Sequence, residues 1–141
     1  MTGERSEPRK KMKILGGAKD RKPGEHPPIY TALVELVGWT MDRTADIPKS
    51  QRFSFGQRLD NLSLDALMLA VKAIFERDRL RKQGHLRDLD LVLEQLRVLW
   101  RLVQDRRWIS QQQLLHVNGR IDEIGRMLGG WIKQQTDSGT R

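Results

Sequence analysis

From Ile29 almost to its end, this chain places apolar residues at alternating steps of three and four, the spacing of one face of an α-helix. Nowhere do apolar and polar residues alternate at step two for long enough to predict a strand. The pattern is interrupted at Pro48, Gly84 and Ser110, which leaves four helical segments. The sequence therefore predicts an all-α fold of four helices.

The first two helices are expected over residues 29–45 and 50–82, the second starting at Ser50 or Phe53. Pro48 ends the first, because proline disfavours helical geometry in the residue before it. Gly84 suits the left-handed position that follows a helix. Cations stabilise the negative C-terminal end of a helix dipole. The second helix is expected to end on four of them, which are Arg77, Arg79, Arg81 and Lys82.

The third helix is expected over residues 86–107, and the fourth from Ser110, which can form a capping box with Gln113. Four apolar stripes joined by short connections predict an antiparallel up-down four-helix bundle over residues 29–135. The expected stripes are Tyr30, Val34, Val37 and Met41 beside Ile29, Leu33 and Leu36; Phe55, Leu59, Leu62, Ala66, Leu69 and Ala73; Leu86, Leu89, Leu93, Leu96, Trp100 and Val103; and Leu114, Val117, Ile121, Ile124, Leu128 and Trp131.

Residues 1–28 differ in composition, with eight basic and four acidic residues, four prolines and four glycines. Such a segment buries too little apolar surface to offset the entropy lost on ordering, so we expect a disordered basic tail. Residues 136–141 are expected to form a flexible C-terminus. The net charge of +8 is divided equally between the tail and the rest of the chain. The bundle itself is therefore basic, which favours a polyanionic partner such as nucleic acid.

Several classes of chemistry have no support in the sequence. Without cysteine, thiol catalysis and disulfides are excluded, and a cytoplasmic location is expected. The longest apolar run, residues 66–71, is far shorter than the roughly 20 residues of a membrane span. His26, His85 and His116 belong to no metal-binding motif, and no serine has a nucleophile-elbow context. We expect no enzyme activity, no metal and no cofactor.

The second and third expected helices have more apolar surface than one bundle needs. At about 100° per residue, several apolar side chains fall far from the core stripes. Self-association is the preferred interpretation, and coverage by irregular packing or by the tail is the alternative. The residues expected in an oligomer interface are Leu64, Leu67, Val71, Ile74, Leu91, Val98 and Leu102.

Arginine side chains recur on the outer faces of the expected helices, where they can donate forked hydrogen bonds to phosphates. A solvated charged face is the alternative for any one of them. The tryptophans lie on core stripes or near helix ends, which favours phosphate contacts over base stacking. The residues expected to contact nucleic acid or a polymerase are Arg52, Arg58, Arg79, Arg87, Arg97, Arg101, Arg106, Arg107, Arg126 and Lys133.

Three segments resemble a known family. Residues 48–58, PKSQRFSFGQR, residues 93–102, and the ending IGRMLGGWIK at residues 124–133 are similar to the accessory variability determinant (Avd) proteins of diversity-generating retroelements. These belong to a wider family of four-helix proteins related to those encoded by ribosomal RNA intervening sequences. The resemblance covers residues 29–135. It implies a protomer of a homopentameric, ring-shaped barrel that binds a reverse transcriptase and template RNA or cDNA and supports mutagenic reverse transcription without catalysing it. The alternative is an intervening-sequence-type protein with a general nucleic-acid-binding or interaction role and no polymerase partner.

Overall fold

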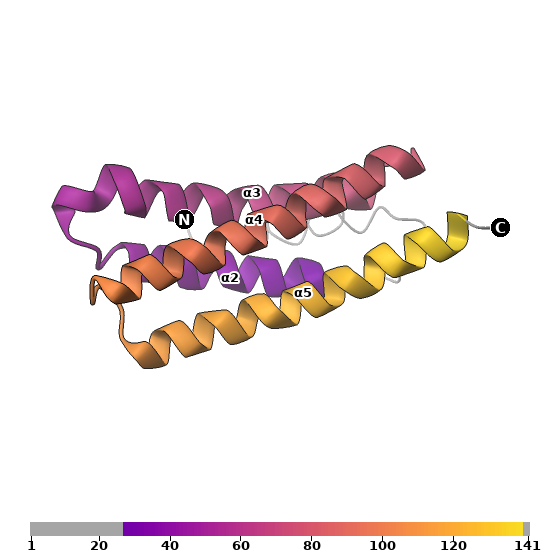
Figure 1. The fold of residues 1–141 in the computed structure, drawn as a ribbon. Coiled ribbons are helices and arrows are strands. Elements are labelled where there is room, and N and C mark those ends of the chain that lie inside the picture. Colours follow the sequence, from indigo (N-terminus) through magenta and orange to yellow (C-terminus); the bar gives the residue numbers. More distant parts are fainter. Residues whose placement is uncertain (1–26, 140–141) are drawn as a thin grey trace, which may run out of the picture.

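The structure, a computed structural model, describes residues 27–139 and arranges them as a bundle of four long helices (Figure 1). Each helix packs against the next one in the chain, and the last packs back against the first. No strand occurs in the described residues, so the expected all-α fold with four helices is confirmed. The helices are α2 (Pro28–Thr44), α3 (Gln57–Phe75), α4 (Arg79–Asp105) and α5 (Gln111–Gly139), and two short turns, η2 (Lys49–Gln51) and the π-helical η3 (Arg52–Gly56), precede α3.

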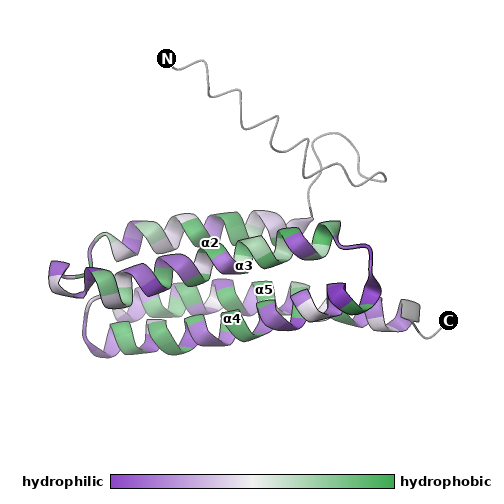
Figure 2. Ribbon diagram, turned by 90° about the horizontal axis from the view of Figure 1, so that it is seen from above, coloured by the Kyte–Doolittle hydropathy of each residue, from purple (hydrophilic) through white to green (hydrophobic). Residues whose placement is uncertain are grey.

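The core forms where the apolar stripes of the helices meet. All six residues of the stripe expected for α4, including the bulky Trp100, are no more than 1% exposed. In α5 the four central stripe residues are equally buried, whereas Leu114 and Trp131, at the two ends of that stripe, are half-buried. Figure 2 shows apolar and polar residues interleaved along each helix, as expected for helices with one inner and one outer face. The stripes of these two helices are confirmed.

On α2, one of two adjacent apolar stripes lies outside the core. Val34 and Met41 are about 40% exposed, while Ile29, Leu33 and Leu36 are buried together with Thr40. Both stripes fit a helical period, and the contacts of α2 with α3 and α5 select the one that includes Leu33. The expectation that the Val34 stripe lines the core is therefore wrong for its exposed members.

The junction between the second and third helices also differs from the prediction. Helix α3 ends at Phe75, and α4 begins at Arg79, so Gly84 lies inside α4. The signal that decides this is Asp78, whose carboxylate accepts a hydrogen bond from the backbone N–H of Arg81 at 2.9 Å and caps α4. The carboxylate of Glu76 accepts a hydrogen bond from the Asp78 N–H at 3.2 Å and lies 3.2 Å from His85 Nε2. These two contacts lower the pKa of Glu76, the backbone hydrogen bond most strongly.

The start of α5 has the predicted capping box. The Ser110 hydroxyl accepts a hydrogen bond from the Gln113 N–H at 3.0 Å, and the Gln113 side chain accepts one from the Ser110 N–H at 2.9 Å. Helix α5 then continues to Gly139, past the end of the bundle expected at residue 135. The expected basic tail, residues 1–28, lies outside the described residues except for Pro27 and Pro28.

Replacing Asp78 by alanine is expected to lower the free energy of unfolding by about 1 kcal/mol, because the first turn of α4 loses its side-chain acceptor. Asp78→Asn is the matched control, since an asparagine oxygen also caps a helix. Urea denaturation of the three proteins measures the difference. An equal loss in both variants would show that the charge of Asp78, and not its cap, stabilises the junction.

Candidate nucleic-acid interface

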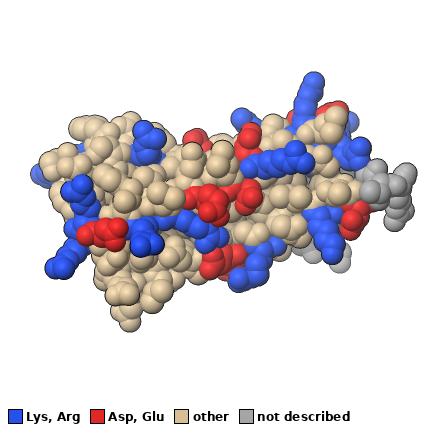
Figure 3. All heavy atoms as spheres, in the orientation of Figure 1, with Lys and Arg blue, Asp and Glu red and all other residues tan. Residues whose placement is uncertain are grey.

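The ten cationic residues expected to contact nucleic acid are spread along the whole bundle. All are exposed except Arg97, which is half-buried. Arg52 and Arg58 lie near the end of the bundle where α4 passes to α5, and so do Arg101, Arg106 and Arg107, whereas Arg79 and Lys133 lie toward the end where α3 passes to α4. We call these the α4–α5 end and the α3–α4 end. On the face shown in Figure 3, lysine and arginine side chains lie at both ends and a group of acidic side chains lies near the middle.

Arg97 is held by two carboxylates. Its Nε donates to Glu94 at 3.1 Å, and its Nη1 donates to Asp122 of α5. The hydrogen bond to Asp122 is the main reason that the pKa of Arg97 is raised. A Cβ at Gly125 would lie 3.8 Å from Arg97 Nη2, an ordinary contact, so this guanidinium does not require a glycine beside it. Arg97 therefore links α4 to α5, and substituting it would change helix packing as well as surface charge.

At the α4–α5 end, one arginine has a backbone conformation that side chains rarely adopt. Arg107 has a φ of 64°, a left-handed geometry that costs a residue other than glycine about 1–2 kcal/mol. Its neighbour Arg106 lies over the ring of Trp108, with 5.9 Å between the guanidinium carbon and the ring centroid. Both arginines are exposed. The N–H groups of Arg107 and Trp108 donate hydrogen bonds to the carbonyls of Gln104 and Val103 at 2.8 and 3.1 Å, which is the Schellman motif that ends α4, so the left-handed geometry of Arg107 serves to terminate the helix.

A second group of cations was missed as a site by sequence reasoning. The basic residues expected to end the second helix surround the N-terminus of α4 instead, so the dipole interpretation is wrong. Cations at the positive end of a helix dipole are unfavourable. Within residues 27–139, no carboxylate forms an ion pair with any of the four side chains, although the charge of Arg81 contributes to the lowered pKa of Glu76. This group, the basic cluster, consists of Arg77, Arg79, Arg81 and Lys82.

The basic cluster lies where the N-terminal segment joins the bundle. Lys82 lines a hollow together with Pro27, Pro28 and Trp131. Residues 1–26 precede Pro27 in the chain, and the segment 1–28 carries a charge of +4. Figure 2 shows the connection between α3 and α4 as strongly hydrophilic. The basic cluster therefore lies beside the point where the basic N-terminal segment enters α2, and no ion pair within residues 27–139 accounts for its four charges. This makes it the strongest candidate for a phosphate-binding surface.

The apolar surface in excess of the core is present in the folded protomer. Leu91 and Val98 are each 59% exposed and Leu102 is 42% exposed, all on the outer side of α4. The candidates on α3, which are Leu64, Leu67, Val71 and Ile74, are half-buried, and Leu67 packs against the core. The outer side of α4 thus carries an uncovered apolar stripe, which we define as Leu91, Val98 and Leu102. Such a stripe is typical of a protein–protein interface.

Metal-binding clusters and membrane-spanning helices are both absent from the part of the chain that the structure describes. There, no three side chains of His, Asp or Glu are grouped so that they could hold a metal ion. None of the described helices combines the length and the apolar character of a bilayer-spanning segment.

Comparison of the chain with models of known protein families gives a match to one family. The model of a family described as bAvd-like matches residues 29–135, which is 107 of the 141 residues. The match begins in the first turn of α2 and ends near the C-terminus of α5, so it includes the four helices of the bundle. The matched range, residues 29–135, is the same as the range of the resemblance found in the sequence. No curated protein matches the chain.

Proposed function

The chain belongs to the bAvd-like family, and from this membership we propose that it is a non-catalytic accessory protein of a diversity-generating retroelement. In this role it binds the reverse transcriptase and the template RNA or cDNA and supports mutagenic reverse transcription. The observation that carries the proposal is the family match over residues 29–135, which include nearly all of the bundle. The absence of cysteine supports the cytoplasm as the compartment in which it acts.

The basic cluster supports the nucleic-acid part of this proposal. Four cations within six residues surround the end of α4 where positive charge is least favourable, and no described carboxylate pairs with them. Phosphates on a nucleic acid would neutralise both the side chains and the helix terminus. The exposed Arg87, Arg101 and Arg126 extend positive charge along the bundle.

The apolar stripe on α4 supports a ring of protomers. A stripe of three large side chains, two of them 59% exposed, leaves substantial apolar surface in water in a lone protomer. We propose that it packs against the α3 face of a neighbouring protomer and closes a homopentamer. Such a contact joins two different surfaces, and contacts of this kind form rings when the rotation between protomers closes.

Co-expression with the reverse transcriptase of a diversity-generating retroelement tests the functional proposal. We expect the polymerase to co-purify with a tagged copy of this chain, both with and without RNase treatment, because the proposed assembly contains a direct protein–protein contact. A complex that survives only without RNase would mean that RNA alone bridges the two proteins. Retention of RNA with no polymerase in either sample would contradict the proposal and favour the intervening-sequence-type alternative.

A further inference from the structure

An aromatic ring stands in solvent at the α4–α5 end of the bundle. Phe53 is 83% exposed, the highest value among the large apolar residues that the structure describes. It belongs to the π-helical turn η3, and its near neighbour Phe55 points the other way and packs edge-on against Trp108, with 5.3 Å between ring centroids. Irregular turns of this kind are frequent at functional sites. The turn therefore anchors one phenylalanine in the protein and projects the other into water.

Two hollows adjoin the Phe53 ring. One, of about 480 Å³, extends along α3 toward α4 past Arg58, Leu62 and Leu99. The other, of about 560 Å³, lies between α2 and α3 and is lined by Arg52 and Gln57 among others. Both exceed the roughly 300 Å³ at which pockets begin to hold small organic molecules. Each hollow has a volume that would hold a planar ring the size of a nucleobase beside Phe53.

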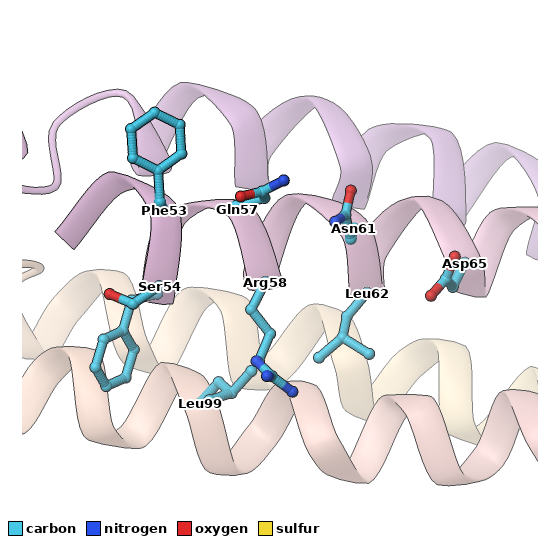
Figure 4. A pocket seen from close by; sticks show the side chains of 9 residues that line it. Phe53, Ser54, Gln57, Arg58, Asn61, Leu62, Asp65 and Leu99 are labelled. Carbon is cyan, nitrogen blue, oxygen red and sulfur yellow. The ribbon is translucent and has the colours of Figure 1, made fainter.

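The polar groups around Phe53 suit a nucleotide. Figure 4 shows Gln57 and Asn61 on the same side of α3 as Phe53, one and two helical turns further on, while Arg58 points toward Leu99 of α4. The side-chain amides of Gln57 and Asn61 offer both donors and acceptors. Arg52 and Arg58 are exposed, and neither forms an ion pair within residues 27–139. The surroundings thus combine an aromatic face, amide groups and two available cations with two carboxylates, Asp60, which accepts a hydrogen bond from Thr44, and Asp65 further along α3.

We infer that Phe53 is a stacking platform for an unpaired base of the bound nucleic acid, with Arg52 and Arg58 holding the adjacent phosphates. This inference rests on the proposed function and specifies how one part of the nucleic acid is bound. Single strands are bound by aromatic side chains that stack on bases beside cations that follow the backbone. A regular duplex keeps its base faces stacked on one another, so Phe53 selects unpaired nucleotides. The four tryptophans remain buried or half-buried, and Phe53 is the aromatic residue that sequence reasoning overlooked.

Three substitutions of Phe53 test this inference. Binding of a labelled 12-nucleotide oligouridylate and of a 12-base-pair RNA duplex is measured by fluorescence anisotropy at one salt concentration. Phe53→Ala and Phe53→Leu are expected to weaken binding of the single strand roughly tenfold, because each removes the aromatic face. Phe53→Tyr is expected to bind like the unaltered protein, and the duplex is expected to bind all variants equally. Leu115→Ala, at a position that is 65% exposed on α5, is the matched control and is expected to change neither affinity.

Several results would overturn the inference. Full single-strand affinity in Phe53→Leu would show that the site needs an apolar side chain and not an aromatic face, and an equal loss on duplex would show no selection of unpaired bases. Unchanged RNA binding in Phe53→Ala, together with loss of the co-purifying reverse transcriptase, would place a protein on Phe53. Each of these results differs from the one that would contradict the proposed function itself, in which the unaltered protein binds neither the oligouridylate nor the RNA duplex.

Discussion

Replacing Arg77, Arg79, Arg81 and Lys82 together by glutamine is expected to weaken binding of duplex DNA on the order of a hundredfold at low salt. Each phosphate contact contributes about 0.9 to the slope of log K against log salt concentration, so four lost contacts lower the slope by up to about 3.6. Anisotropy titrations of a labelled 20-base-pair DNA at several salt concentrations measure both quantities. The same substitutions are expected to leave the free energy of unfolding unchanged or to raise it slightly, because they remove cations from the positive end of α4.

A second quadruple variant separates a defined site from a general charge effect. Replacing the exposed Arg87, Arg101, Arg126 and Lys133 by glutamine removes the same charge from positions outside the basic cluster. We expect this variant to lose clearly less affinity and less of the salt slope. If both variants lose affinity equally, binding follows net charge and the basic cluster is no special site. Arg97 is left out of both sets because of its bonds to Glu94 and Asp122.

The helices themselves were predictable where one apolar stripe decides the packing. The α4 stripe, from Leu86 to Val103, matches its sequence prediction residue by residue, because its apolar residues recur at steps of three and four without a gap, whereas the outer stripe has only Leu91, Val98 and Leu102. On α2, Val34 and Leu33 lie on adjacent apolar stripes, and only the neighbouring helices determine which is buried. Local periodicity predicts that a helix is amphipathic, but its rotation in a bundle is a tertiary property.

The junction between α3 and α4 shows how competing local signals mislead. Gly84 and four cations are typical of a helix C-terminus, whereas Asp78 is an N-cap residue. The structure follows Asp78, since the capping hydrogen bond to Arg81 and the Glu76 contacts with Asp78 and His85 act together at this turn. A misplaced helix boundary affects the functional interpretation as well as the predicted fold, because it gives the basic cluster the role of stabilising a helix C-terminus.

The candidate site was predictable in composition and less so in geometry. The exposure of most of the predicted cations follows from their place outside the apolar stripes. The link from Arg97 to Asp122 joins residues 25 positions apart, and sequence spacing does not reveal it. Phe53 lies in the π-helical turn η3, and apolar spacing at steps of three and four does not predict such a turn.

Because the apolar stripe on α4 lies outside the core of the protomer, substitutions in it test the proposed ring without unfolding the protomer. Leu91, Val98 and Leu102 lie outside the core, which is completed by the inner stripe of the same helix. Polar substitutions of these exposed residues therefore cost the protomer little, because surface changes usually alter the free energy of unfolding by less than about 0.5 kcal/mol. In a ring the same substitutions bury a charge without a partner, which is strongly unfavourable.

Leu102→Asp and Leu91→Asp are accordingly expected to convert a pentamer into monomers while the circular dichroism of the helices is unchanged. Light scattering after size exclusion is expected to give the unaltered protein a mass near five protomers, about five times 16.4 kDa, and each variant a mass near one. Leu115→Asp is the matched control, because Leu115 is 65% exposed on α5 but is not part of the stripe, and it is expected to stay pentameric. A monomeric unaltered protein at micromolar concentration would contradict the ring, and a pentamer that tolerates both aspartates would place its interface elsewhere.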